Sequence, residues 1–279
     1  MTTLPATTSA SRKSRPQVNL TVLRREQLSP HMVRIVAGGP GLDGYVNNDF
    51  VDRYVKIAFP QPGIEYSEPL DLWTIRETMP REQWPHTRTY TVRWVDEAAG
   101  ELAIDFVIHG DEGLAGPWAA SAQPGDSIVF TGPGGGHNPD PAADWYLFAG
   151  DESALPAIGA VIEALPQHAR GLAFLEVDSE ADVQAIAAPA GIDLRWLFRA
   201  GVAAGASEVL INAVRDSEWP EGRVQVFAHG ERGYMKSLRD VFYAQHGLDR
   251  GQVSLSGYWA MGRVEDDFQA EKKLPVGQI

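Results

Sequence analysis

Two side chains that could hold a flat ring and its phosphate stand two residues apart, at Arg88 and Tyr90. They belong to the run Arg88-Thr89-Tyr90-Thr91, which opens a predicted β-strand. Because successive side chains of a strand point to opposite faces, Arg88 and Tyr90 share a face. A guanidinium there can pair with a phosphate while the phenol ring stacks on a planar group. The alternative is an ordinary strand with a half-buried tyrosine and a solvated arginine.

A glycine-rich turn follows at residues 113–119, with the sequence Gly-Leu-Ala-Gly-Pro-Trp-Ala. Glycines permit close approach of the backbone, and a proline suits the first turn of a short helix whose free N–H groups face an anion. The segment can therefore cradle a phosphate. The alternative is a plain surface turn.

A strand, a tight turn and a helix start follow one another from Trp145 to Pro156. The turn lacks the Gly-x-Gly-x-x-Gly spacing of a dinucleotide-binding loop, so its composition alone is weak evidence for a nucleotide. Asp151 and Glu152 would repel a pyrophosphate, which leaves the backbone near Gly150 and the Ser153 hydroxyl as the expected contacts. The role of the two acids stays open.

The next strand ends with Asp178. An acidic residue at that place favours a free ribose 2′-hydroxyl over a 2′-phosphate, and so slightly favours NADH over NADPH. The alternative is that Asp178 and Ser179 simply begin the next helix.

The elements that must position these residues fall into two halves. Six alternating apolar runs in residues 18–136 predict an antiparallel sheet or small barrel, in which residues 92–95 form a hairpin with residues 102–108. The runs cover residues 18–27, 31–38, 52–60, 88–96, 101–109 and 126–133. Residues 61–87 fit no strand pattern and are predicted to form a long loop.

The second half alternates strands with helical stretches, such as residues 154–165 and 231–245, which predicts β-α-β units around a parallel sheet. The strands are expected at residues 145–150, 171–177, 192–198, 224–230 and 253–259. We therefore predict a disordered tail (1–17), a barrel domain (18–136), a Pro- and Asp-rich linker (137–144) and a nucleotide-binding α/β domain with a C-terminal helix (145–279).

The amino-acid composition excludes several classes of partner and cofactor. The 24 Lys and Arg against 37 Asp and Glu give a net charge of −13, which argues against nucleic acid or an anionic membrane as the main partner. The chain has no Cys, so redox chemistry needs a bound organic cofactor. We predict no metal site. No apolar run resembles a membrane span or a secretory signal, so we expect a cytoplasmic protein.

The order of the motifs resembles the siderophore-interacting protein family, the flavin-dependent ferric-siderophore reductases of the ferredoxin reductase superfamily. The motifs are RTYTVR, a His-Gly followed by Gly-Pro-Trp, GDESALPAI, FAHGE and SGYW, and the resemblance runs over about residues 17–267. It implies a β + α/β fold, with a six-stranded antiparallel FAD-binding barrel before an NAD(P)H-binding α/β domain.

The resemblance also implies roles for single residues. It assigns Arg88 to the FAD phosphate, Tyr90 to the isoalloxazine face and Thr91 to a hydrogen bond near the reactive flavin nitrogen, although strict alternation points Thr91 away from Tyr90. A lone histidine at a strand end is usually structural or solvated, but the family carries His109 beside the flavin. The further cofactor-binding candidates are Thr89, Gly113, Gly116, Pro117, Trp118, Ala119, Gly150, Asp151, Glu152, Ser153, Asp178, Gly230, Glu231 and Trp259.

Basic residues around the flavin edge hold the anionic ferric complex in the family. The matching candidates are Lys56 and Arg263, whereas Ala260 stands where a basic residue is common. Lys272 and Lys273 either compensate or belong to a solvated tail.

The predicted function follows from these roles. A hydride passes from NAD(P)H to FAD, and single electrons pass to Fe(III) in a bound siderophore, which releases Fe(II). No catalytic side chain is required. The alternatives are a flavin reductase for another acceptor and a non-enzymatic siderophore carrier. The identity of the siderophore and the oligomeric state are beyond the sequence.

Overall fold

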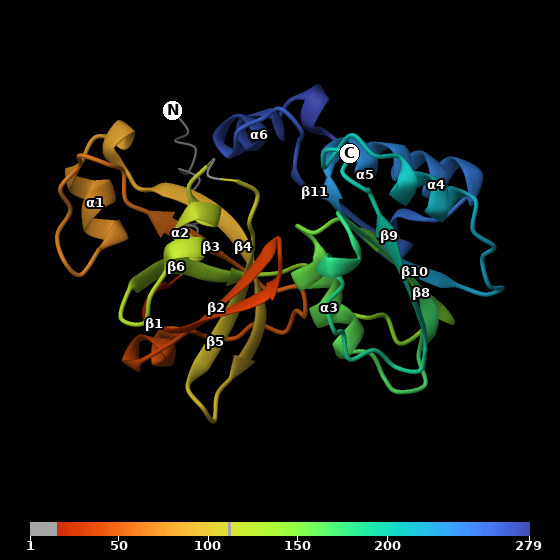
Figure 1. Ribbon diagram of the computed structural model, residues 1–279, viewed down its shortest axis with the longest axis horizontal. Coiled ribbons are helices and arrows are strands. Elements are labelled where there is room, and N and C mark those ends of the chain that lie inside the picture. Colours follow the sequence, from red (N-terminus) through yellow and green to blue (C-terminus); the bar gives the residue numbers. More distant parts are fainter. Residues whose placement is uncertain (1–15, 111–112) are drawn as a thin grey trace, which may run out of the picture.

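The computed structural model of the chain describes residues 16–110 and 113–279. Two halves lie side by side, a barrel and a helix-covered sheet (Figure 1). The predicted tail, residues 1–17, falls almost wholly outside the described residues, and Gln17 already begins the first strand. None of the helices within the described ranges is long and apolar enough to cross a bilayer.

The first half is a closed antiparallel barrel with the strand order β1-β2-β5-β4-β3-β6. Closure pairs every strand on both sides, so the barrel has no free edge. The strands are β1 (Gln17–Ser29), β2 (Met32–Gly38), β3 (Tyr54–Phe59), β4 (His86–Asp96), β5 (Glu101–Val107) and β6 (Ser127–Gly134). All six correspond to the alternating runs, and the hairpin between β4 and β5 pairs Val92 with Ile104 as expected.

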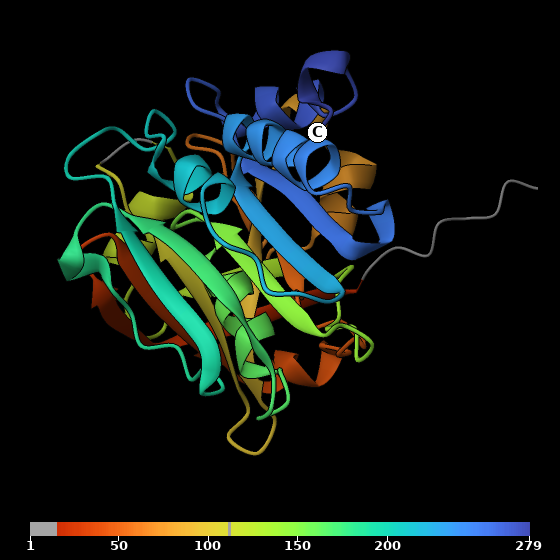
Figure 2. The same cartoon turned by 90° about the vertical axis from the view of Figure 1, so that its right-hand side faces the viewer.

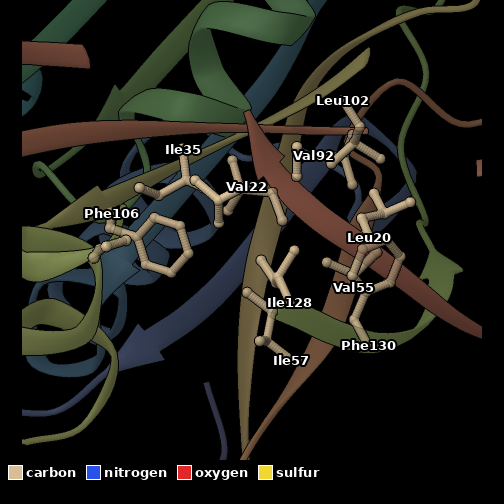
Figure 3. Close-up of a cluster of buried hydrophobic side chains, with 14 of the residues drawn as sticks. Leu20, Val22, Ile35, Val55, Ile57, Val92, Leu102, Phe106, Ile128 and Phe130 are labelled. Atoms are coloured by element: carbon tan, nitrogen blue, oxygen red, sulfur yellow. The ribbon is translucent and has the colours of Figure 1, made fainter. Parts of the chain in front are cut away.

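Alternation along the strands fills the interior of the barrel (Figure 3). Leu102, Ile104 and Phe106 of β5 are at most 1% exposed and point inward. The opposite face of β5 is also buried, which the alternation did not predict. There the Asp105 carboxylate accepts hydrogen bonds of 2.7 and 2.8 Å from Arg34, so that a buried charge is paired.

The prediction of a long loop over residues 61–87 is wrong. This segment contains helix α1 (Leu72–Thr78) and a 3-10 turn (Arg81–Gln83). Asp71 caps α1, because its carboxylate accepts hydrogen bonds from two backbone N–H groups of the first turn. Only two residues of α1 are buried, so the sequence of this helix lacks a helical repeat of apolar residues long enough to recognise.

The second half is a parallel sheet with the strand order β11-β10-β7-β8-β9. Its strands are β7 (Trp145–Gly150), β8 (Arg170–Val177), β9 (Gly191–Phe198), β10 (Val224–Glu231) and β11 (Val253–Trp259). The helices are α2 (Ala115–Ser121) on the barrel, then α3 (Leu155–Glu163), α4 (Val209–Arg215), α5 (Arg232–Asp240) and α6 (Glu265–Glu271). A π-helical turn continues α5 over Val241–Gln245. Further 3-10 turns lie at Pro40–Gly44, Glu180–Asp182, Arg250–Gln252 and Pro275–Gly277.

The helices cover the sheet on both faces. Helix α3 packs on the face turned to the barrel, and α4 and α5 pack on the outer face (Figures 1 and 2). Helix α6 leaves the sheet and lies beside the barrel. The carboxyl ends of the central strands thus open toward the boundary between the halves, where ligands of such sheets bind.

Side chains join the halves at several places besides α6. Arg93 of β4 forms a bidentate ion pair with Glu163 of α3, with distances of 2.6 and 2.7 Å. The buried Asp182 carboxylate accepts hydrogen bonds from Ser29 (3.2 Å) and from the His31 Nδ1 (2.9 Å) of the barrel. Asp178, Asp182 and His31 also come close enough to surround an ion, but these donors already engage Asp182.

Candidate functional site

Strand β4 brings the predicted flavin-binding side chains to the boundary between the halves. Arg88 is 16% exposed, and its guanidinium lies 3.3 Å from Asp266 of α6. Tyr90 packs its ring on Phe106 at 4.3 Å between centroids, and burial raises the pKa of its hydroxyl. Thr89 is exposed, whereas Thr91 is buried.

The turn predicted to cradle a phosphate is the start of α2. Gly113 has a φ of +84°, a conformation that favours glycine, and no heavy atom lies within 4 Å of where a Cβ would stand. At Gly116 a Cβ would come within 3.3 Å of the Val107 carbonyl oxygen, so a side chain there would crowd the strand. Pro117 lies in the first turn of α2, which has no side-chain cap.

Two predicted contacts on α2 point into the barrel wall instead. Trp118 packs against Phe59 and Phe106 at 5.8 and 5.6 Å, and Ala119 is fully buried. Their side chains hold the helix on the barrel wall, and Gly113 is exposed. His109 is exposed at the strand end. The exposed Gly113 and the half-buried Arg88 guanidinium are each of a kind that fits the phosphates of FAD.

At the carboxyl edge of the sheet, the Asp151 carboxylate joins the ends of three strands. It accepts hydrogen bonds from the Ser153 N–H after β7 (2.9 Å), the Glu231 N–H of β10 (2.8 Å) and the Trp259 indole N–H of β11 (2.9 Å). Asp151 is 2% exposed, and burial raises its pKa. The role left open for this acid is thus structural.

Two glycines make room for this arrangement. Gly230 has a φ of +147°, and a Cβ there would lie 2.9 Å from the Asp151 carboxyl carbon. A Cβ on Gly150 would lie 2.6 Å from the His229 carbonyl oxygen. Both are closer than real Cβ contacts, so any side chain would push the strand ends apart.

Glu231 and Ser153 also bond within the protein. The Glu231 carboxylate caps α5 through the Tyr234 N–H (3.0 Å) and accepts the Met261 N–H (3.1 Å). The Ser153 hydroxyl donates to Asp151. The side chains of Glu231 and Ser153 are thus engaged within the protein, which leaves backbone groups as the candidates for a ligand at this edge.

The structure adds Arg199, which the sequence reasoning missed. Its guanidinium lies 2.6 Å from Glu152, 3.7 Å from Glu176 and 3.8 Å from Asp178. Arg199 directly follows β9, so a charged residue at the carboxyl end of a parallel strand was the available signal. The single positive charge of Arg199 thus lies close to three carboxylates and partly neutralises them.

Glu176 is the most deeply buried of these acids, with no exposed surface. Its Oε1 accepts a hydrogen bond from the Tyr234 hydroxyl at 3.1 Å, whereas its Oε2 has no partner among the described residues. Burial raises its pKa to about 7, and Arg199 opposes the rise. The carboxyl edge is therefore acidic and only partly neutralised.

The predicted substrate-binding residues lie around α6. Lys56 is exposed on β3, and Arg263 forms an ion pair of 2.8 Å with Glu271. The Lys272 ammonium lies 4.6 Å from the centre of the Phe268 ring. Burial lowers the pKa of Lys272, the Glu265 carboxylate opposes this shift, and the charge of Lys56 adds to it.

The family comparisons agree with both halves. Residues 21–137 match the siderophore-interacting FAD-binding domain, and residues 143–262 match the siderophore-interacting protein domain. The chain belongs to the siderophore-interacting protein family.

Similar proteins cover nearly the whole chain. An uncharacterised protein of Mycobacterium tuberculosis is 45% identical over 93% of this chain and 95% of its own length. The ferric vibriobactin reductase ViuB of Vibrio cholerae is 34% identical over 93% and 95%. The NADPH-dependent ferric-chelate reductase of Escherichia coli is 33% identical over 86% and 91%. The crystal structure of the siderophore-interacting protein SipS from Aeromonas hydrophila superposes with a TM-score of 0.79 at 32% identity, covering 93% and 97%.

We predict that Glu176 makes stability depend on pH. Its pKa of about 7 exceeds the usual 4.5, so between these values the folded protein binds a proton that the unfolded chain releases. The free energy of unfolding therefore falls as pH rises through this window, by at most about 3 kcal/mol. Glu176→Gln cannot ionise but can still accept from Tyr234, so it should lose this slope.

Urea unfolding between about pH 5 and about pH 8 measures the effect. The exposed Glu180 lies nearby, and Glu180→Gln should keep the wild-type slope. Equal slopes in wild type and Glu176→Gln would contradict the role of Glu176.

Proposed function

We propose that this protein transfers electrons from NAD(P)H through FAD to Fe(III) in a siderophore, which then releases Fe(II). One contact carries the proposal. The carboxyl end of β11 meets β4, where the hydroxyls of Tyr258 and Thr91 interact. The expected nicotinamide edge and the expected flavin strand are therefore adjacent, as hydride transfer between two cofactors requires.

FAD supplies the chemistry when bound, since it accepts a hydride and gives up electrons singly. Arg88 and the backbone around Gly113 would hold its phosphates, and Tyr90 would pack on its ring. The barrel orients these groups because β4 is paired on both sides. The names of ViuB and of the ferric-chelate reductase support the same acceptor for this chain. The expected cytoplasmic location is part of this proposal.

Two rival functions differ in what they require. A flavin reductase for another acceptor would reduce FAD equally well but would not reduce a ferric siderophore. A siderophore carrier would need no flavin. Anaerobic reduction by NADH, followed by mixing with a panel of ferric siderophores and recording of the flavin absorbance, separates the three.

We predict that Arg88→Ala weakens FAD binding roughly 10- to 100-fold, because a charged hydrogen bond contributes about 1.5–3 kcal/mol. Fluorescence quenching during titration of the flavin-free protein with FAD measures the affinity. Arg250→Ala makes the same charge change at an exposed site of the other half and should bind FAD normally. Unchanged FAD content in Arg88→Ala after gel filtration would refute the assignment.

We predict a modest preference for NADH over NADPH, about 2- to 10-fold, as expected for one partly exposed charge interaction. A 2′-phosphate near Asp178 would meet carboxylates whose only close cation, among the described residues, is Arg199. Anaerobic rates of flavin reduction by the two nucleotides measure the preference, and Asp178→Asn should reduce it. A clear NADPH preference in the wild type would remove Asp178 from the site.

We predict that Lys56→Ala combined with Arg263→Ala raises the KM for an anionic ferric siderophore roughly tenfold. The protein carries a net charge of −13, so local cations must attract the complex. Reduction of FAD by NADH should not change. Arg170→Ala with Arg250→Ala removes as much charge from exposed sites elsewhere and should leave this KM unaltered. Equal losses in both half-reactions would instead indicate a role in folding or in flavin binding.

A further inference from the structure

A chain of hydrogen-bonding side chains runs from the parallel sheet into the barrel. The His229 imidazole on β10 bonds through Nε2 to the Ser254 hydroxyl and through Nδ1 to the Tyr258 hydroxyl, each at 2.9 Å. The Tyr258 hydroxyl is in turn hydrogen-bonded to the Thr91 side chain on β4. Thr91 and His229 are buried, whereas Tyr258 and Ser254 are half-buried, so the chain connects a buried hydroxyl on β4 with a partly exposed one on β11.

The surroundings keep the two ring side chains uncharged. His229 is 4% exposed and packs on Phe227 at 3.8 Å between ring centroids. Burial, followed by the neighbouring His137, lowers the pKa of His229 to about 3. Burial raises the pKa of Tyr258. At neutral pH each of them can pass a proton on but does not retain a charge.

Charged and titratable groups of three other elements face this chain. Asp52 before β3, Tyr54 on β3 and Asp151 after β7 all raise the pKa of Tyr258 further. None of these groups stabilises a negative charge on the phenol. A proton leaving Tyr258 must therefore be replaced at once from Thr91.

The reaction in the proposed function leaves one proton over. The hydride that enters from the nicotinamide consists of one proton and two electrons, and two Fe(III) ions take only the electrons. The overall change is NAD(P)H plus two Fe(III) giving NAD(P)⁺, two Fe(II) and one H⁺. A flavin ring that lies against the buried Thr91 would need a route by which that proton reaches water.

We propose that Thr91, Tyr258, His229 and Ser254 form this route and carry the proton from the flavin ring to solvent. The inference rests on the proposed function and on Thr91 lying next to the ring.

Each step forms one bond to hydrogen and breaks another. The Thr91 oxygen takes up the proton and releases its own to the Tyr258 oxygen. Tyr258 passes its proton to the His229 Nδ1, and the His229 Nε2 releases one to Ser254, which gives one to water. The first two members, Thr91 and Tyr258, are already hydrogen-bonded to each other. The imidazole is neutral before and after, in keeping with its low pKa.

Tyr258→Phe tests the route, because it removes only the central hydroxyl. We would reduce the protein with dithionite and follow its reoxidation by ferric citrate in H₂O and in D₂O. Wild type should be slower in D₂O, and Tyr258→Phe should be roughly 100-fold slower than wild type, the lower end of what a positioned proton-transfer group contributes. Tyr146→Phe is the matched control and should leave the rate unchanged, since the hydroxyl of this buried residue donates to the Asp140 carbonyl, away from the route.

A second measurement needs no turnover. The ¹⁵N shifts of the His229 imidazole should show a proton on Nε2 and an accepting Nδ1, and Tyr258→Phe should move the Nδ1 shift to that of an unbonded nitrogen. A purely structural hydrogen bond would move this shift as well but would leave the solvent isotope effect untouched. The combination therefore identifies proton transfer.

FAD content is measured first in every variant. If Tyr258→Phe loses FAD, the same rate measurements are made on Ser254→Ala instead, because this variant interrupts the route at the end that meets solvent. Wild-type rates and isotope effects in Tyr258→Phe, or in Ser254→Ala where that variant decides, would overturn the route and leave the proposed function standing. Wild-type protein that binds FAD but reduces no ferric siderophore would overturn the proposed function, and the route with it.

Discussion

One buried carboxylate holds the carboxyl edge of the parallel sheet together. Asp151 binds the backbone after its own strand, the end of β10 and the last side chain of β11. Taking a charge out of water is costly unless hydrogen bonds replace the lost hydration, and here several donors converge on it. The glycine at 230 is part of the same constraint, because a side chain there would occupy the place of the carboxylate.

Negative and positive side chains lie on different sides of the boundary between the halves. The sheet edge is filled with acids, for which Arg199 is the shared cation within the described residues. Arg88 and Lys56 stand apart from this acidic cluster, on the barrel. Anionic groups are therefore better held on the barrel side of the boundary, and the sheet edge offers mainly backbone groups to a nucleotide.

The positions and the order of the strands could be predicted from the sequence, because the short-range pattern of apolar residues determines them. Every strand had an alternating or continuous apolar run, and the order of runs predicted barrel before sheet. Helix α1 was missed because its apolar face is short. Residues 88 and 90 were found by their spacing within one strand. Arg199 and the pair Thr91–Tyr258 were not, since their partners come from distant segments that only the folded chain brings together.

The barrel and the sheet are rigid for different reasons, yet the site needs both. Closure of the barrel places Thr91, because β4 is paired on either side. Asp151 places Tyr258, because it binds the indole of the next residue along β11. Thr91 and Tyr258 stay in contact only if the two halves stay docked. The ion pair between Arg93 and Glu163 joins β4 itself to the sheet domain. The contact between the hydroxyls is therefore a consequence of docking, and this ion pair is one of the contacts that keep the expected flavin strand next to the expected nicotinamide edge.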